Sequence, residues 1–224
     1  MMNQGGVQEP AIRVLVVDDH GLFRTGMASL LGQQPDIEVV ARASGGRRAV
    51  QLASELRPDV VLMDLRMPDL DGAEATRVIL ERHPRTRVLA LTVLSSDEDV
   101  AAALQAGMCG FLSKDTSIED VVAAVRAAAS GSAWLSPRAA EVVLGAVRRA
   151  DAGYEPDPEL IDQLSRREFD VLRLIARGLG NVEIAQTLNV SPRTVKNHVS
   201  SILAKLGLPS RIQAAIYAVR RGLD

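Results

Sequence analysis

The sequence has very few of the residues that form disulfides and zinc sites. Cys109 is the one cysteine, and the three histidines, at positions 20, 83 and 198, have no zinc-like spacing. These counts exclude an internal disulfide and a cysteine-cluster metal site. Aromatic residues make up only 3% of the chain, against 47% for all hydrophobic residues. The core must therefore be aliphatic, which suits α/β and all-α folds.

Long apolar runs are also missing. No stretch approaches the roughly 20 residues that a helix needs to span a bilayer. The first ten residues, MMNQGGVQEP, lack the charged and apolar regions of a secretory signal. We therefore expect a cytoplasmic protein without a membrane partner.

The net charge of −2 hides an asymmetry between the two ends of the chain. Residues 1–162 hold 16 Lys and Arg against 24 Asp and Glu, a net charge of −8, whereas residues 163–224 hold 10 against 4, a net charge of +6. A length of 224 residues exceeds the usual single domain of roughly 100–150. Two domains are expected, and the basic C-terminal one is suited to a polyanionic partner.

Five β-branched runs alternate with five amphipathic segments between residue 12 and about residue 130. The runs are IRVLVV, IEVVARA, DVVLMD, RVLALTV and CGFLSK, and helices are predicted near 21–33, 45–56, 72–83, 96–107 and 117–130. Because the apolar runs are continuous, the strands should be buried on both faces of a parallel sheet. The second run alternates more and indicates a strand near the edge. We predict a doubly wound (βα)5 domain over residues 11–134.

The remaining residues are predicted to be a linker and an all-α domain. A linker helix in SPRAAEVVLGAVRRA and a linker rich in Asp, Pro and Gly occupy 135–162, and four helices follow in 163–224. Ser165 and Glu168 have the spacing of a capping box. Asn181 is expected to cap a short helix, and Ser191 with Pro192 to begin the next one. The pattern is helix, tight turn, helix.

Polar residues follow the ends of four predicted strands. They are Asp18, Asp19, Asp64, Thr92 and Lys114. Ligands bind beyond the carboxyl ends of the strands in doubly wound sheets. Three carboxylates together need a hard cation, and oxygen ligands suit Mg²⁺. A carboxylate can accept a phosphoryl group, while Lys114 and Thr92 can neutralise or donate to its oxygens. The alternative is that each Asp simply caps the following helix.

The helix predicted to follow Ser191 is amphipathic. Val195, Val199, Ile202 and Leu206 share one face, and the opposite face carries Arg193, Lys196, Asn197 and Ser200. A basic helix after a tight turn is the form that enters the DNA major groove. Lys196 and Asn197 are placed to read base edges, and Arg193 with Thr194 to hold phosphate. The alternative is an ordinary solvated helix face.

The stretches VVDDHGLFRTGM, DVVLMDLRMPDLDG, LT and GFLSKD resemble the receiver domain of two-component response regulators over about 12–130. The resemblance implies that Asp64 accepts phosphate from a sensor histidine kinase. Asp18, Asp19 and the backbone carbonyl of Arg66 would join Asp64 in binding Mg²⁺. Thr92 and Phe111 would be the switch pair, with Phe111 in place of the tyrosine often found there, and Lys114 would bind the phosphate.

The stretch LSRREFDVLRLIARGLGNVEIAQTLNVSPRTVKNHVSSILAKLG resembles the DNA-binding domain of the NarL/LuxR type. This resemblance implies DNA contacts from the predicted helix, including His198 and Ser200. Ser200 stands where some relatives carry a basic residue. The last helix, about 210–221, would pair subunits through Ile212, Ala215, Ile216 and Val219, or pack these residues into its own domain.

Together the two resemblances predict a transcription regulator that is switched by phosphorylation and binds operator DNA. We expect a homodimer on phosphorylation or DNA binding, and no turnover enzyme. Two alternatives stay open: a phosphatase or phosphotransferase that uses Asp64 for turnover, and a DNA-binding protein whose acidic pocket is only structural.

Overall fold

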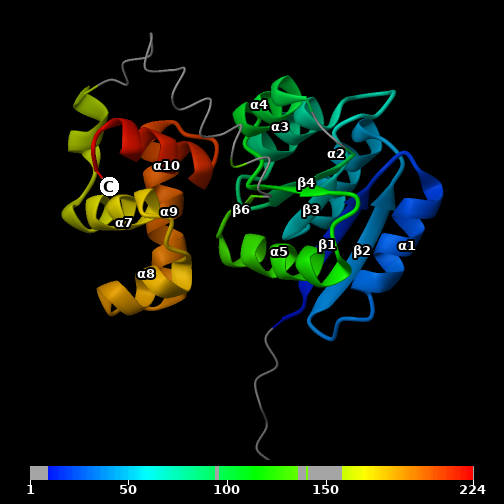
Figure 1. Ribbon diagram of the computed structural model, residues 1–224, viewed down its shortest axis with the longest axis horizontal. Coiled ribbons are helices and arrows are strands. Elements are labelled where there is room, and N and C mark those ends of the chain that lie inside the picture. The colour runs from blue at the N-terminus through cyan, green and yellow to red at the C-terminus, as the bar shows by residue number, and fades with distance from the viewer. Residues whose placement is uncertain (1–9, 94–95, 136–139, 141–157, 224) are drawn as a thin grey trace, which may run out of the picture.

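The structure, a computed structural model, describes residues 10–93, 96–135, 140 and 158–223. An α/β domain and a helical domain lie side by side (Figure 1). Most of the linker predicted over 135–162, including nearly all of its helix, lies outside the described residues.

Within the described residues, the sheet of the α/β domain has six parallel strands in the order β2-β1-β3-β4-β5-β6. They are β1 (Ile12–Val17), β2 (Ile37–Ala43), β3 (Val60–Met63), β4 (Arg87–Thr92), β5 (Gly110–Ser113) and β6 (Trp134–Leu135). The order confirms the doubly wound fold and places β2 at the edge. The sequence did not predict β6, because two residues are too few to show a periodicity.

Helices cover both faces of the sheet (Figure 1). One apolar cluster joins the sheet to α2, α3 and α4, and the other joins it to α1 and α5. All four residues of β3 are buried, as a continuous apolar run predicts. The helices are α1 (Gly21–Leu31), α2 (Gly46–Leu56), α3 (Gly72–Arg82), α4 (Asp97–Gln105) and α5 (Ile118–Ser130).

The helical domain has its own aliphatic core, to which α7, α8, α9 and α10 all contribute. Its elements are the 3-10 helix η2 (Pro158–Gln163), α7 (Arg166–Ala176), α8 (Asn181–Leu188), α9 (Pro192–Leu206) and α10 (Arg211–Arg220). Ser191 caps α9 by accepting from the Thr194 N–H at 3.0 Å, as predicted. The prediction for α8 was wrong: Gly180 is the N-cap, and Asn181 is the buried first residue of the helix.

Asn181 is not free to cap α8 because its side chain bonds elsewhere. Its amide Nδ2 donates to the Ser130 carbonyl, and its Oδ1 accepts from Arg211 at 2.7 Å. The Gly180 N–H donates instead to Glu183 Oε2 at 2.6 Å, which satisfies one donor at the start of the helix.

Glu168 connects the start of α7 to α9. The predicted capping box is present, with Glu168 Oε2 accepting from the Ser165 N–H at 2.7 Å. The same carboxylate accepts from Ser201 at 2.6 Å and from Lys205 at 2.7 Å. Burial works to raise the pKa of Glu168, but the hydrogen bonds from Lys205, Ser201 and Ser165 outweigh it and lower the pKa to about 2. This carboxylate therefore favours the folded state only while it is ionised.

Glu168→Gln is expected to lower the free energy of unfolding of the helical domain by about 1.5–3 kcal/mol at neutral pH, the usual worth of charge-assisted hydrogen bonds. Because the folded-state pKa is depressed from 4.5 to about 2, the wild-type contribution is complete above pH 4.5 and is lost as the pH falls towards 2. Urea unfolding at several pH values measures this, with Glu183→Gln as an exposed capping control. An equal pH dependence in wild type and Glu168→Gln would contradict it.

Candidate functional site

The carboxyl ends of β1, β3 and β5 bring three charged side chains together. Asp18, Asp64 and Lys114 each directly follow a strand. The Asp64 N–H donates to the Val17 carbonyl at 2.9 Å, and the Lys114 N–H to the Thr92 carbonyl at 3.0 Å. Sheet hydrogen bonds thus continue through these residues and fix the positions of their side chains.

Lys114 lies between two buried carboxylates. Its Nζ is 2.6 Å from Asp18 Oδ2 and 2.7 Å from Asp64 Oδ2. The Asp18 and Asp64 side chains are only 2% and 5% exposed, so the ammonium supplies the cation that a buried carboxylate needs. Burial works to lower the pKa of Lys114, but the hydrogen bonds to Asp18 and Asp64 outweigh it and raise the pKa. The Phe23 ring lies beneath the ammonium, with its centroid 5.0 Å from Nζ.

An acidic cluster of the kind that binds Mg²⁺ lies at this edge. One ligand atom each from Asp18, Asp19, His20 and Asp64 lies within 4.8 Å of the others. Three of the four groups offer carboxylate oxygens, the ligands that Mg²⁺ prefers. His20 had not been predicted to join them; its ring Nδ1 lies 2.7 Å from Asp19 Oδ1. The donor set therefore fits a hard divalent cation.

The other predicted residues of this site lie around the carboxylates. The Arg66 N–H donates to Asp64 Oδ1 at 3.3 Å, while its guanidinium pairs with Asp99 on α4 at 2.7 Å. Thr92 and Phe111 are both buried, at the end of β4 and within β5. The Thr92 hydroxyl donates to the Val93 carbonyl at 3.4 Å, a weak bond that is easily exchanged for another acceptor.

Lys114→Met is expected to lower the free energy of unfolding by about 3–5 kcal/mol in buffer without Mg²⁺, because it leaves two buried carboxylates without a cation. Added Mg²⁺ should restore part of this loss by supplying positive charge to the same oxygens. Urea unfolding with EDTA and with Mg²⁺ measures both effects. Combination with Asp64→Asn should be less destabilising than the two single effects added together, and strict additivity would contradict the pairing.

The second group of predicted residues lies on α9. Arg193, Asn197 and Ser200 are exposed, and Thr194, Lys196 and His198 are half-buried. The sequence predicts that this polar face is free. In the structure it is partly occupied, because Lys196 Nζ donates to the Ala129 carbonyl of α5 at 2.9 Å. Burial lowers the pKa of Lys196, and repulsion from Arg87 adds to this. A predicted base-reading residue is therefore occupied by the α/β domain.

A buried polar network joins the two domains next to Lys196. Arg211 Nη1 donates to Asn181 Oδ1 at 2.7 Å and approaches the Gly131 carbonyl at 3.5 Å. Burial, with a smaller contribution from Arg87, lowers the pKa of Arg211 to about 10. Gly131, with φ +88°, ends α5 in the left-handed region. Sequence patterns gave no sign of the contact with the receiver side, since Gly131 takes part through its backbone carbonyl.

The apolar face of α10 also contacts the α/β domain. Ile212 and Ile216 are buried and belong to the same cluster as Met108 and Phe111. The sequence offered pairing of subunits or packing into the helical core, and these two residues do not pack into the helical core. Ala215 does pack against the helical core, while Val219 is 40% exposed. The face predicted to pair subunits is thus largely covered.

Comparison with known families finds a match for each of the two domains. Residues 14–126 match the family model of the response regulator receiver domain. Residues 162–218 match that of the bacterial regulatory proteins of the luxR family. The chain belongs to the response regulators that join a receiver domain to a LuxR-type DNA-binding domain. It is thus a DNA-binding regulator of the two-component type, and neither matching family is a class of enzymes.

Similar proteins extend over almost the whole chain. The response regulator VraR of Staphylococcus aureus is 42% identical over 212 residues, which cover 95% of this chain and 98% of VraR. The crystal structure of ChrA, from a heme-sensing two-component system, is 34% identical and covers 96% of this chain and 100% of its own, with a TM-score of 0.52. RcsB, in a structure of two dimers bound to two parallel DNAs, is 25% identical over 93% of this chain and 98% of its own, with a TM-score of 0.55.

Among the described residues, no helix combines the length and the apolar character needed to cross a membrane.

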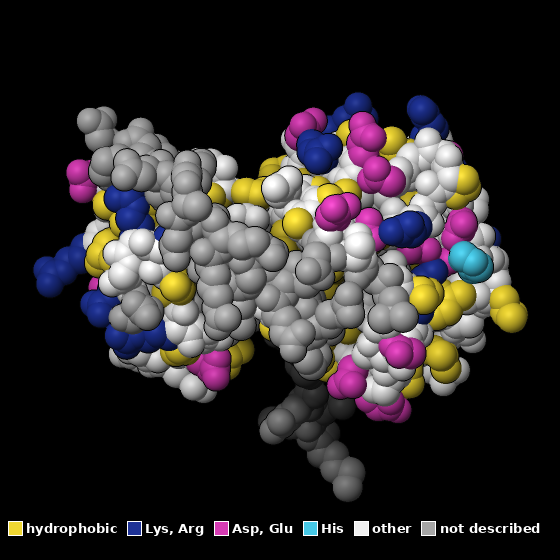
Figure 2. Space-filling model, turned by 45° about the horizontal axis from the view of Figure 1, so that its top comes forward, with side chains coloured by type: hydrophobic (Ala, Val, Ile, Leu, Met, Phe, Trp, Pro, Cys, Tyr) yellow, Lys and Arg dark blue, Asp and Glu magenta, His cyan; other side chains and the backbone are white. Residues whose placement is uncertain are grey.

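Charge differs between the domains as the sequence predicted. On the face shown in Figure 2, Lys and Arg side chains gather on the DNA-binding domain, and Asp and Glu side chains are more frequent over the receiver.

Proposed function

We propose that phosphorylation of Asp64 by a sensor histidine kinase controls DNA binding by this protein. The observation that carries the proposal is the buried Asp64 carboxylate, which lies 2.7 Å from the Lys114 ammonium beside two further aspartates. A carboxylate oxygen of Asp64 attacks the phosphorus of a phosphohistidine, the N–P bond breaks, and the imidazole leaves. The product is an aspartyl phosphate.

The surrounding residues have separate roles in this step. Asp18, Asp19, Asp64 and the Arg66 carbonyl would hold Mg²⁺, which neutralises negative charge on the phosphoryl oxygens when it is bound. Lys114 exchanges one carboxylate for a phosphoryl oxygen. The Thr92 hydroxyl leaves its weak bond to Val93 and donates to another phosphoryl oxygen. Movement of Thr92 opens space for Phe111, and this links the pocket to the surface formed by β4, α4 and β5.

The ion pair between Arg66 and Asp99 offers a second connection from the pocket to α4. A phosphoryl group on Asp64 lies two residues from Arg66 and attracts its guanidinium. Asp99 also completes the capping box of α4 with Ser96. Loss of the Arg66 partner therefore changes the charge balance at the first turn of α4, a helix that shares an apolar cluster with Ile212 and Ile216 of α10.

In the arrangement seen here, the DNA-binding surface is restrained. Lys196 is bonded to α5, and Ile212 and Ile216 of α10 are covered by the receiver. We infer that phosphorylation separates the domains, which frees α9 for the major groove and α10 for pairing of subunits. Arg193, Thr194, Lys196, Asn197, His198 and Ser200 would then contact operator DNA, which fits the dimers on DNA described for RcsB.

The test is sedimentation of the protein with Mg²⁺, before and after addition of acetyl phosphate or beryllofluoride, together with titration of DNA. The expected result is a shift from monomer towards dimer and tighter DNA binding. If neither property changes while mass spectrometry shows a phosphorylated Asp64, the coupling is wrong. If no phosphoryl group is incorporated, the acceptor assignment is wrong.

The two alternatives make different predictions. A phosphatase or phosphotransferase hydrolyses or transfers phosphate repeatedly and gives no role to the DNA-binding domain. A regulator with a structural pocket binds DNA equally well with and without phosphate. The hydrogen bonds between the DNA-binding domain and α5 favour control by the receiver.

We further propose that the receiver spans 11–134, that the linker spans 135–162 with the DNA-binding domain in 163–224, and that the protein works in the cytoplasm.

A further inference from the structure

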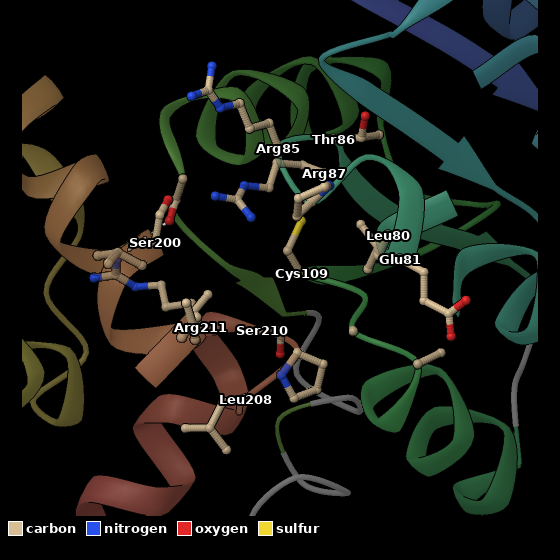
Figure 3. A pocket seen from close by; sticks show the side chains of 18 of the residues that line it. Leu80, Glu81, Arg85, Thr86, Arg87, Cys109, Ser200, Leu208, Ser210 and Arg211 are labelled. Carbon is tan, nitrogen blue, oxygen red and sulfur yellow. Dashed lines mark hydrogen bonds between the residues drawn. The ribbon is translucent and has the colours of Figure 1, made fainter. Parts of the chain in front are cut away.

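A cavity of about 600 Å³ lies between the receiver and the DNA-binding domain. Its receiver wall comes from the end of α3, the loop before β4 and the end of α4, and its other wall comes from α9 and residues 207–211. Figure 3 shows Arg87 on the receiver side pointing towards Ser200 of α9, with Leu80 on the receiver side and Leu208 on the other. The volume is typical of sites for small molecules. Because both domains form the walls, the complete cavity exists only while they are in contact.

The lining of the cavity combines positive charge with apolar surface. Of the described residues that line it, four are arginines and one, Glu81, carries a carboxylate. Leucine and proline side chains from both domains, including Leu80, Leu203 and Leu208, supply the apolar walls. This composition suits a molecule that carries a negative group on an apolar body.

Arg87, which is half-buried, contributes a hydrogen-bond donor without a partner to the lining of the cavity. Its Nε is buried and has no hydrogen-bond partner, and the guanidinium has no ion pair among the residues that the structure describes. A buried donor without a partner is costly, and an anionic acceptor beside it would remove that cost. Arg87 is the first residue of β4, so its backbone is fixed by the sheet while its side chain lines the cavity.

Cations meet across the contact between the domains. Repulsion from Arg87 works to lower the pKa of both Lys196 and Arg211, in addition to the larger effect of burial. An anion in the cavity would lie near Arg87 and would reduce this repulsion. Its binding energy would therefore favour the closed arrangement of the domains.

We propose that this cavity binds a small amphipathic anion, an organic carboxylate or phosphate ester with an apolar body, and that the bound anion holds the two domains together. Its effect on DNA rests on the function proposed above: the anion and the phosphoryl group would favour opposite arrangements. Each should then weaken the other's binding by the same factor.

Isothermal titration of the full chain with decanoate and with octyl phosphate tests the site itself. The buffer contains EDTA, so that the Asp64 pocket does not respond to Mg²⁺. Inorganic phosphate and octanol are the comparison probes. Inorganic phosphate has the negative charge without an apolar body, and octanol has the apolar chain without the charge. We expect saturable binding of at least one amphipathic anion, a preference between the two that identifies the anionic group, and no saturable binding of the comparison probes.

Arg87→Met keeps the aliphatic stem and removes the charge, and it should weaken binding by at least about tenfold. Arg82→Met, on the exposed end of α3 outside the cavity, is the matched control and should bind like wild type. Ala204→Phe fills the cavity from the other domain and should also reduce binding, which guards against a local defect at Arg87. Equal binding by all variants, or none by wild type, would overturn the proposal.

The effect on DNA is measured separately. Saturating anion should weaken DNA binding by the unphosphorylated protein, and beryllofluoride should raise the dissociation constant of the anion. Saturable anion binding that leaves DNA affinity unchanged would overturn the holding role while supporting the site. Failure of beryllofluoride to alter DNA binding in the absence of the anion would overturn the proposed function instead.

Discussion

Replacement of Gly131 by alanine is expected to raise the DNA affinity of the unphosphorylated protein by about 5- to 150-fold, the usual range of coupling between sites. A Cβ at this position would lie 2.8 Å from Asn181 Nδ2, the group that donates to the neighbouring Ser130 carbonyl. The contact would push the DNA-binding domain away from α5. Fluorescence anisotropy with labelled operator DNA, without a phosphodonor, measures the change.

Gly178→Ala is the matched control for this experiment. Gly131 and Gly178 both have positive φ, +88° and +81°, so alanine strains the backbone at either position. At Gly178, however, the added Cβ meets no atom of the described part of the chain within 4 Å. If Gly178→Ala raises DNA affinity as much as Gly131→Ala does, the gain comes from backbone strain and not from release of the contact.

Asp64→Asn is expected to abolish phosphoryl incorporation and the whole response of DNA binding and dimer formation to acetyl phosphate. An amide oxygen is a far weaker nucleophile than a carboxylate, and it also lacks the charge that pairs with Lys114. Intact-protein mass and sedimentation before and after acetyl phosphate give the two readings. Asp36→Asn, at a surface ion pair with Arg126, serves as the control for loss of one carboxylate.

Retention of the response in Asp64→Asn would show that another group accepts the phosphoryl moiety. Gly131→Ala in the Asp64→Asn background adds a further check. This double variant should bind DNA as tightly as Gly131→Ala alone, because release of the contact acts after phosphorylation. A double variant that binds as weakly as wild type would show that the gain at Gly131 requires Asp64, and it would contradict release of the contact as a step after phosphorylation.

The sheet and the acidic pocket could be predicted because each is encoded locally. Continuous apolar runs mark buried parallel strands, and a charged residue directly after such a run must lie at the carboxyl edge of the sheet. Asp18, Asp64 and Lys114 are all of this kind, and the structure brings them within bonding distance. The capping box of Ser165 and Glu168 is equally local.

The contact between the domains could not be predicted from the sequence. Asn181 has the residue type and position of a helix cap, yet its amide bonds to a backbone carbonyl 51 residues away. Ile212 and Ile216 form an apolar stripe that fits a subunit interface, a domain core or the receiver equally well. Such patterns show that a face must be covered, but the covering partner depends on the arrangement of the whole chain.

The cations on either side of the domain contact have a consequence for ionic strength. Dissolved salt screens the repulsion among Arg87, Lys196 and Arg211, although less than at an exposed surface, and so favours the closed arrangement. Salt also weakens DNA binding directly, because the release of counterions from DNA phosphates, which favours association, gains less free energy at higher salt. The unphosphorylated protein experiences both effects, whereas the phosphorylated protein, already open, experiences only the second. A plot of log affinity against log salt should therefore be steeper before phosphorylation than after it, so that a change in cellular salt acts most strongly on the resting protein.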